Sequence, residues 1–572
     1  MKEKIKFHHC AFALIFLVAA ALYFNSLNNA FFFDDHPNIL DNPYIRNLSD
    51  LSLFFQGVKS YTGLPRALTT LSFAINYHLH GLDVLGYHGV NLMLHILCGF
   101  LVFSLSRILF GLHLERREGP LEGKVPVYGF RVNFLALLTS LVFVSHPLQV
   151  NTVTYIVQRT EGLAGFFYLL SLFLFASGSF QRGRKKLVSF SGAGLSFACA
   201  VFAKETGFTI PITWIVFDFV FVCETKEDRL KRLRIYVPLL ILLAVYLLFY
   251  LRGGIFHLLI KRTKGGELAP WHYLLTQSNV IIEYFKLMAL PLPSWLNIDH
   301  DFPISRSFLE YPTFLSFPAL VFLLSAAVWF TRKKKLASFA VFFFFIVLAP
   351  SSSVIPLWDA MVEYRLYLPV FSFSLILTAA FYDGSRFLAR RFSEKLGMGL
   401  VSAASILLIL FYSAITIERN RTFRDPLTLW SDVARKSPGK MRAHHNLGKA
   451  YFEKGQIDKA LEEGEIALQL SARLDRKENV KFVLNLLGGI YLTKGETRKA
   501  EEMLQQAIEV DAGYATSYYN LSCVYAANRE KEKAIEYLRK AISLDPKYKE
   551  KARSDRDLDP LRGLKEFQEL AG

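Results

Sequence analysis

Two adjacent carboxylates, Asp34 and Asp35, lie in the stretch NNAFFFDDHPNILDNPYIRNLSD (28–50), directly after an apolar segment. A carboxylate near a lipid bilayer is costly unless it faces water, a partner or a substrate. If the segment is extended, neighbouring side chains point to opposite faces, so both carboxylates cannot aim at one atom. One could act as a general base while the other binds a metal, a phosphate-linked cation or a backbone donor. The alternative is a solvated turn, since Asp-Asp-x-Pro is good turn chemistry.

Other polar residues stand beside apolar runs, in HPLQVNTVTYIVQRTEG (146–162), KETG (204–207), NIDHD (297–301) and WDAMVEYRLYLP (358–369). Taken singly, charges at the ends of apolar runs are snorkelling anchors. Taken together, Arg159, Lys204 and Arg365 could converge on an anion, and a lipid-linked phosphate is the anion expected at that depth. His300 lies between two aspartates, as in a metal site. Three adjacent residues cannot all ligate one ion easily, so a metal there is the less favoured alternative.

The composition indicates a membrane protein. Hydrophobic residues make up 52% of the 572 residues, and 52 of them are Phe in long apolar runs; a soluble protein of this length is more polar. The net charge of +17 is compatible with nucleic-acid binding, but basic residues lie in short blocks between apolar runs, as in QRGRKK (181–186), RLKRLR (229–234) and RKKK (332–335). That is the pattern of cytoplasmic loops, so we expect no nucleic-acid partner. The five cysteines show neither metal spacing nor a disulfide framework.

Eleven apolar segments are each near the ~20 residues needed to cross a bilayer: 10–27, 84–110, 132–146, 162–180, 187–203, 208–223, 235–251, 312–331, 336–350, 366–382 and 398–417. The first could be a signal peptide, but no convincing small-x-small cleavage site follows, which favours a span. With the basic N-terminus inside, the three basic blocks also fall inside and the C-terminal tail lies outside. The run 273–291 does not fit this topology, so we predict a re-entrant or interfacial segment.

On this topology several segments share the external side with Asp34, namely 30–83, 146–161, 204–207, 252–311 and 351–365. Within the first of them, RALTTLSFAINYHLHGL (66–82) has apolar residues at mixed helical spacing. This spacing predicts one or two short surface helices.

The chain changes character near residue 426, where it becomes polar and repetitive. Two segments align at a period of 34 with four positions in register: NLLGGIYLTKGETRKAEEMLQQAIEVD (485–511) and NLSCVYAANREKEKAIEYLRKAISLD. An earlier copy, offset by 40 with an insertion near 471–477, is NLGKAYFEKGQIDKALEEGEIALQL (446–470). A 34-residue period with this pattern of small and large residues is typical of tetratricopeptide (TPR) repeats. We predict a membrane domain over 1–425, then three helix pairs and a capping helix near 559–570 in 426–572.

An ordered set of motifs resembles a known family. The similar features occur in this order: FFFDDHPNILDNPYIRN, RALTTLSFAINYHLHGLDVLGYHGVNLMLH, HPLQVNTVTYIVQRTEGLAGFFYLLSL, AKETGFTIP, EYRLYLP and the closing repeats. With them the chain resembles the transmembrane-and-TPR protein O-mannosyltransferases (TMTC family) and their bacterial relatives, which belong to the GT-C class. The chain departs from the pattern at Arg66-Ala67-Leu68, where Arg-Pro-Leu is expected. The resemblance implies an all-α fold: a polytopic GT-C-like domain of about eleven transmembrane helices followed by a soluble TPR α-solenoid.

The resemblance also implies an inverting transfer of a sugar from a polyprenyl-phosphate donor to an acceptor hydroxyl, such as a protein Ser or Thr, on the non-cytoplasmic side. Asp34 would be the general base and Asp35 the supporting acid. Arg159, Lys204 and Arg365 would bind the donor phosphate, where charge develops in the transition state. Further substrate-binding candidates are Arg66, His146, Glu205 and Glu363. The expected partners are the lipid carrier and an acceptor protein held by the repeats; a divalent cation is possible.

Two other functions compete with this one. A non-enzymatic membrane scaffold could use the external repeats to assemble an envelope or secretion complex, because repeat domains bind peptides on concave surfaces. Such a scaffold has no use for an acid pair with convergent cations. A lipid-flipping transporter would need charges at mid-membrane, but the spans are nearly free of charge apart from Asp218 near a span end. The expected location is a bacterial inner membrane, with the repeats in the periplasm.

Overall fold

The computed structural model describes residues 2–59, 65–118, 129–251, 269–471 and 479–572. These residues form helices joined by turns and loops, and their β pairing is limited to one isolated bridge between Lys59 and Pro65. The predicted all-α architecture is confirmed. The chain forms two compact units, Met1–Ile298 with Phe302–Asp425, and Asp299–Asp301 with Pro426–Gly572. Parts of the predicted external segment 252–311 and of the insertion 471–477 lie outside the described residues.

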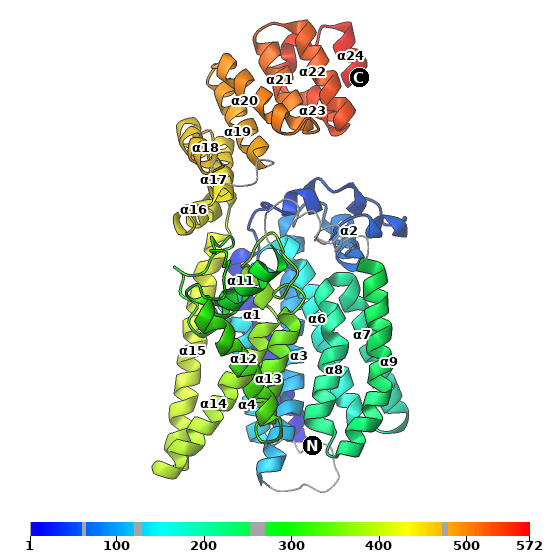
Figure 1. The fold of residues 1–572 in the computed structure, drawn as a ribbon, viewed down its shortest axis with the longest axis vertical. Helices are drawn as coiled ribbons and strands as arrows, with labels where there is room; N and C mark the ends of the chain where they lie inside the picture. Colours follow the sequence, from blue (N-terminus) through cyan, green and yellow to red (C-terminus); the bar gives the residue numbers. More distant parts are fainter. Residues whose placement is uncertain (1, 60–64, 119–128, 252–268, 472–478) are drawn as a thin grey trace. The chain divides into compact units, whose positions relative to one another are not determined.

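The first unit is a bundle of long apolar helices (Figure 1). They are α1 (Lys2–Tyr23), α3 (Val84–Glu118), α4 (Phe130–Ser145), α6 (Arg159–Ser179), α7 (Gly183–Ala203), α8 (Ile210–Phe217), α9 (Lys226–Leu251), α11 (Pro270–Ala289), α12 (Thr313–Trp329), α13 (Lys335–Leu348), α14 (Pro369–Arg391) and α15 (Glu394–Thr422). One continuous cluster of buried apolar residues joins most of them. Gly99 of α3 permits close packing, because a Cβ there would lie 2.7 Å from Val144 of α4 and 2.9 Å from Ile15 of α1.

Seven of the described helices are long and apolar enough to cross a membrane, and α4 with the short helix after it, bent by 52°, would make an eighth span. The chain is therefore an integral membrane protein. All eleven predicted spans are helical, but α9, α13 and α14 are not among these candidates. Helix α13 has only 14 residues, fewer than the ~20 needed to cross 30 Å. Helix α11, which covers most of the run 273–291, is not a candidate span either.

Helices α1 and α15 end on the same side of the first unit. Asn420 donates from Nδ2 to the Leu22 carbonyl and to Asn25 Oδ1, both at 2.9 Å, and Asn25 Nδ2 donates to the Ile417 carbonyl at 3.0 Å. If both helices cross the membrane, they cross in the same direction, so the number of spans is odd. The eleven spans predicted from the sequence meet this condition, whereas a total of eight spans does not. If the bent pair is a span, at least one of α9, α13 and α14 must also cross.

A topology experiment follows from these contacts. The basic residues after α6 and α12 lie at the end of the bundle opposite to residues 24–30 (Figure 1), and basic loops stay in the cytoplasm. We expect alkaline phosphatase fused after Gly572 to be active, since the enzyme works only outside the cytoplasm, and the same fusion after Lys185 to be inactive. The reverse pattern would place Asp34 in the cytoplasm.

The first segment predicted to be external, 30–83, folds into short turns and one helix where the structure describes it. These are η2 (His36–Leu40), η3 (Pro43–Ile45), η4 (Leu51–Phe55) and α2 (Ala67–His80). Ile39, Ile45, Phe54 and Phe73 form a small core of their own with residues of α3 and the turn before α6. The prediction of one or two surface helices over 66–82 is thus met by a single helix, which ends at Gly81 with φ of 59°.

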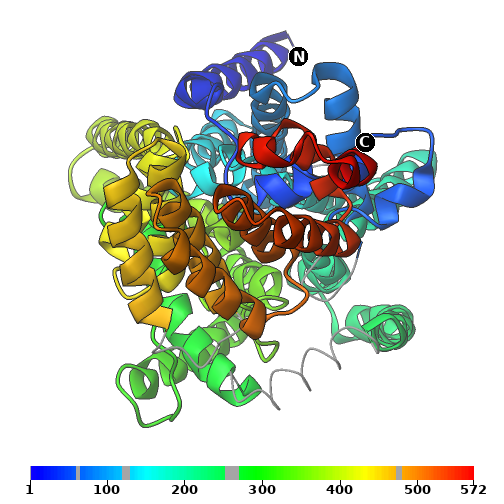
Figure 2. The same ribbon diagram turned by 90° about the horizontal axis from the view of Figure 1, so that it is seen from above.

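The second unit is a row of antiparallel helix pairs, which Figure 2 shows side by side in gold, orange and red-brown. Helix α16 (Pro426–Lys436) comes first, and the pairs are α17 (Met441–Glu453) with α18 (Ile457–Ser471), α19 (Val480–Thr493) with α20 (Thr497–Val510), and α21 (Ala515–Ala527) with α22 (Lys531–Leu544). The buried Ala460, Ala500 and Ala534 let the two helices of each pair approach closely. Instead of one capping helix near 559–570, α23 (Lys547–Ser554), η12 (Arg556–Leu561) and α24 (Lys565–Ala571) complete the unit. Pro560 and Gly563 disfavour a continuous helix there.

The turn inside each helix pair needs a left-handed residue at the same place. It is Gly455 (φ 72°), Gly495 (φ 77°) and, in the third pair, Arg529 (φ 64°). A side chain with a Cβ pays about 1–2 kcal/mol in this conformation, so Arg529→Gly should stabilise the repeats by about 1 kcal/mol. Thermal melting of a 426–572 fragment should be cooperative, with a higher midpoint for Arg529→Gly. Arg529→Ala is the matched control, because it removes the charge but keeps the strain. An equal gain from Arg529→Ala would disprove the backbone explanation.

Candidate active site

The two aspartates lie in a tight turn rather than in the extended segment assumed from the sequence. Phe33 has a φ of 49°, which is rare for a residue with a side chain, and such strain is often found at functional sites. On one side of it the Phe32 ring stacks on Tyr155, with ring centroids 4.5 Å apart. On the other side, Asp35 precedes the π-helical turn η2. The change of backbone direction at Phe33 gives Asp34 and Asp35 different environments.

Asp35 is fully buried, and its carboxyl joins the first external segment to the turn before α6. One oxygen accepts the Phe32 backbone N–H at 3.1 Å, and the other accepts the Val157 N–H at 2.8 Å. Burial raises the pKa of the Asp35 carboxyl to about 8, although the two N–H groups and Arg159 oppose the shift. Because Asp35 is buried and both of its oxygens are engaged by backbone N–H groups, it is poorly placed to reach an acceptor hydroxyl and well suited to hold the turn.

Asp34 is only half-buried. Its backbone N–H donates to the Tyr155 hydroxyl at 3.1 Å, and its carbonyl accepts Asn38 Nδ2 at 2.7 Å. The Tyr155 hydroxyl also hydrogen-bonds to the Asp34 side chain. Of the two carboxylates, Asp34 is the one that solvent reaches, on a backbone fixed from both sides. A general base needs both a fixed position and access to its substrate.

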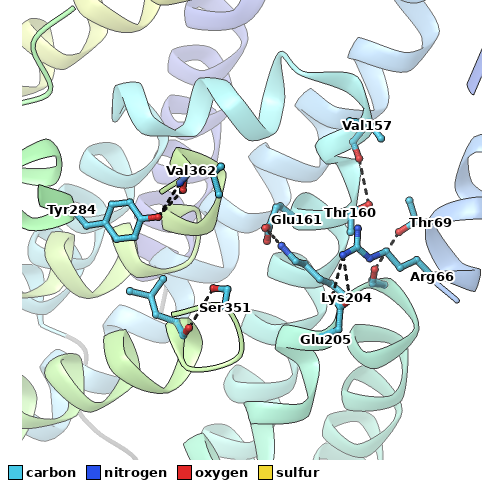
Figure 3. A network of polar contacts seen from close by, with 12 residues as sticks. Arg66, Thr69, Val157, Thr160, Glu161, Lys204, Glu205, Tyr284, Ser351 and Val362 are labelled. Atoms are coloured by element: carbon cyan, nitrogen blue, oxygen red, sulfur yellow. Dashed lines mark hydrogen bonds and ion pairs between the residues drawn. The ribbon is translucent and has the colours of Figure 1, made fainter. Parts of the chain in front are cut away.

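Four charged side chains meet where α6 begins and α7 ends (Figure 3). Arg66 donates to the Glu205 carboxylate at 3.1 and 3.3 Å, and Lys204 forms an ion pair with Glu161. Solvent reaches 13–24% of the Arg66, Lys204 and Glu205 side chains but only 8% of Glu161. We call these four residues the charged cluster. Its charges cancel, so an entering anion would have to compete with the two carboxylates.

Arg159 is fully buried and its nitrogens are engaged by the protein. Its Nε donates to Asn91 Oδ1 at 2.8 Å, and its two terminal nitrogens donate to the carbonyls of Ser72 (3.2 Å) and Tyr87 (3.0 Å). The guanidinium carbon lies 4.6 Å from the Phe73 ring centroid. In this geometry Arg159 binds α2 and α3 to the start of α6.

Three other predicted site residues are also engaged inside the protein. Arg365 donates to the carbonyls of Asp359 (2.8 Å) and Ala360 (3.0 Å). His146 Nε2 lies 2.9 Å from the Met288 carbonyl, and its Nδ1 accepts the Leu148 N–H. Glu363, 1% exposed, accepts hydrogen bonds from Asn151 Nδ2 and the Asn297 N–H, and Arg419 lies 3.9 Å away.

The hydrogen bonds described above for Arg159, Lys204 and Arg365 go to different protein groups, so the convergence of these three residues stays a prediction. The binding of a phosphate by Arg159 and Arg365 stays a prediction. What the structure does bring together is Lys204 with Glu161 and Arg66 with Glu205. Asp35 binds the backbone of Val157, which precedes Glu161 by four residues.

Sequence reasoning missed two residues of this region. Glu161 forms the ion pair with Lys204, and Tyr155 hydrogen-bonds to Asp34. Both lie in the segment 146–162, in which the sequence predicts only His146 and Arg159 as candidate site residues. An acid in the first turn of a helix is favoured by the helix dipole, which could have marked Glu161. Among the residues that the structure describes, no group of three or more His, Cys, Asp or Glu could hold a metal ion.

Comparisons with known proteins agree with this architecture. Family models for the tetratricopeptide repeat match residues 440–512 and 515–548, so the C-terminal helix pairs are TPR repeats. The chain is 24% identical over 515 residues to the protein O-mannosyl-transferase Tmtc3 of Drosophila melanogaster, covering 79% of this chain and 54% of the relative. It is 22% identical over 536 residues to human TMTC3 (86% and 54%) and 32% identical over 212 residues to human TMTC2 (35% and 23%).

The chain is thus similar to the TMTC protein O-mannosyltransferases, as its motifs predicted. It spans about half the length of the TMTC3 relatives. A crystal structure of the APC/C hetero-tetramer Cut9-Hcn1 aligns with 88% of this chain and 90% of its own at 14% identity, but the TM-score of 0.24 is too low to bear on the fold.

Proposed function

We propose that the chain is an inverting GT-C glycosyltransferase that moves a sugar from a polyprenyl-phosphate to a hydroxyl group of a protein. The observation that carries the proposal is the unequal acid pair: Asp35 is buried and holds the turn, whereas Asp34 is the more exposed of the two. The curated relatives are named protein O-mannosyl-transferases, which supports both the reaction class and mannose as the first sugar to test.

In this proposal Asp34 is the catalytic base. It accepts the proton of the acceptor hydroxyl as the hydroxyl oxygen attacks the anomeric carbon from the face opposite to the phosphate. The bond from that carbon to the phosphate oxygen breaks, and the phosphate leaves on its lipid with the electron pair. Because this leaving group is already good, positioning should supply much of the rate.

The donor phosphate is assigned to Lys204 and Arg66. Their partial exposure permits contact with a ligand, whereas Arg159 is fully buried and Arg365 nearly so. Glu161 and Glu205 keep the two cations in place, and they can accept hydrogen bonds from sugar hydroxyls once the phosphate has entered. Cations placed where charge develops in the transition state stabilise the departing phosphate.

Lys204→Met tests the phosphate assignment. The substitution keeps the unbranched apolar stem and removes the charge, so donor affinity should fall about 10–100-fold, the loss expected for a hydrogen bond to a charged group. The KM for the donor would show this directly, with the KM for the acceptor unchanged. Lys286→Met is the matched control, because Lys286 is an exposed lysine of the same unit that pairs with Glu283. An unchanged donor KM in Lys204→Met would remove this lysine from the donor site.

The repeats are proposed to present the protein acceptor. TPR domains hold peptides on their concave face, and the chain leaves the first unit at the end where Asp34 lies, since the Ala30 N–H donates to the Arg424 carbonyl at 3.2 Å. We place this end outside the cytoplasm, in the periplasm if the membrane is a bacterial inner membrane. The basic loops at the other end support that side.

The function is tested by intact-mass analysis of envelope proteins from cells with the wild-type chain, without it, and with Asp34→Asn. The proposal expects one or more proteins to carry an added hexose only with the wild-type chain. Identical protein masses in all three strains, with an assembled envelope complex lost only in the deletion strain, would favour the scaffold function instead.

A further inference from the structure

The acidic stretch NIDHD, which resembled a metal site, has a different role in the structure. Asp299–Asp301 belongs to the second unit, although these residues precede it in the sequence by more than a hundred positions. Arg442 binds the Asp299 carboxylate in a bidentate manner, with Nε and one terminal nitrogen each at 2.6 Å, and Lys440 pairs with the same carboxylate. Only 4% of the Asp299 side chain is exposed.

The backbone of the segment is recognised as well as its side chain. Ser437 Oγ donates to the Asp299 carbonyl at 2.9 Å and accepts the Asp301 N–H at 3.1 Å, and Lys440 donates to the His300 carbonyl at 2.8 Å. At Gly439 an added Cβ would lie 2.7 Å from the Asp301 carboxylate. Main-chain bonds with a side-chain anchor are how proteins bind extended peptides.

We propose that Ser437, Gly439, Lys440 and Arg442 form a binding site for an extended acidic peptide, and that Asp299–Asp301 is the ligand that this chain supplies to it. We call these four residues the acidic-peptide site. Arginine recognises a planar carboxylate through two parallel hydrogen bonds, and Ser437 reads the backbone on either side of His300. Burial alone would raise the pKa of the Asp299 carboxyl, but Arg442 and Lys440 lower this pKa to about 2. The ligand therefore stays charged at physiological pH.

A ligand in the same chain changes how the site meets other peptides. Because the ligand binds intramolecularly, a free peptide of similar affinity has to exceed the effective concentration of that ligand before it displaces it. Removing the Asp299 carboxylate should open the site to a free peptide with the same sequence. The inference is independent of sugar transfer.

The first experiment measures peptide binding to the purified full-length chain. A fluorescent peptide with the sequence of residues 297–303 (NIDHDFP) should bind the Asp299→Ala variant at least about tenfold more tightly than the wild type, since the wild-type site holds its own ligand. A control peptide with Asn in place of the first Asp should bind neither chain. Equal binding of the first peptide to both chains, absence of binding to the variant, or equal binding of both peptides would overturn the proposal.

The second experiment does not require a free site. Hydrogen exchange of the full-length chain should show the amide of Asp301 protected in the wild type and exchanging about tenfold faster in Arg442→Ala, because hydrogen bonds to a charged group are lost. Arg435→Ala is the matched control, since Arg435 is exposed and pairs with Asp432. The charge-swapped pair Asp299→Arg with Arg442→Asp should recover part of the protection. Exchange that is equally fast in the wild type and in Arg442→Ala would contradict the site.

Discussion

Asp34→Asn should abolish sugar transfer while leaving the protein folded and able to bind its donor. The amide keeps the size of the side chain and can still bond to Tyr155, but it lacks the oxygen that accepts the hydroxyl proton. Loss of a general base costs about 10²–10⁴-fold in rate. A lost turn hydrogen bond costs only ~1 kcal/mol of stability, so the two roles differ clearly in size. The readout is kcat of transfer, measured beside donor binding and thermal stability.

Asp50→Asn is the matched control for this substitution. Asp50 lies in the same external segment, is exposed, and accepts hydrogen bonds from the N–H and hydroxyl of Ser52, which an Asn oxygen can also accept. It should leave kcat unchanged. If Asp34→Asn also transfers sugar at the wild-type rate, Asp34 is a turn residue and the catalytic assignment fails.

Asp35→Ala should destabilise the first external segment, and activity should fall with the fold rather than with the chemistry. The substitution leaves the buried N–H groups of Phe32 and Val157 without their acceptor. An unsatisfied buried donor costs about 1–3 kcal/mol, so the two together should cost roughly 2–6 kcal/mol. Hydrogen exchange of residues 30–40 and 154–160 should rise together, and the melting temperature should fall.

Asp41→Ala is the control, because Asp41 is an exposed aspartate of the same segment. It should leave exchange and melting unchanged. If Asp35→Ala retains the wild-type exchange pattern but loses kcat, the two aspartates have exchanged roles, and Asp35 would be the catalytic residue.

Much of the fold follows from patterns that one sequence already contains. Long apolar runs must be helical in a membrane, since backbone groups there have no water to bond to, and all eleven predicted spans are helices. The 34-residue period gave three helix pairs, and the family models match the same region. Helices α13 and α14 show where length and composition alone do not decide whether a helix crosses.

The site was harder to predict because burial decides the role of a charged residue, and burial depends on tertiary contacts. Arg159 and Lys204 look alike as cations at span ends, but one is engaged by three protein acceptors and the other stays partly exposed. Asp34 and Asp35 could not be distinguished by sequence either, because the left-handed turn at Phe33 sets their different exposures. A Phe gives no local signal for such a turn, since Gly or Asn is the usual residue there.

Sugar transfer by the purified chain is the most direct test of the central claim. The full-length protein in liposomes would be given a radiolabelled polyprenyl-phosphate mannose and envelope proteins from cells that lack the chain, beside Asp34→Asn and Asp50→Asn. The account predicts labelled protein with the wild type and with Asp50→Asn, and none above background with Asp34→Asn. Equal labelling by Asp34→Asn would contradict the account. The account would also be contradicted if the wild type labelled no protein with polyprenyl-phosphate mannose or with any other polyprenyl-phosphate sugar that is tried.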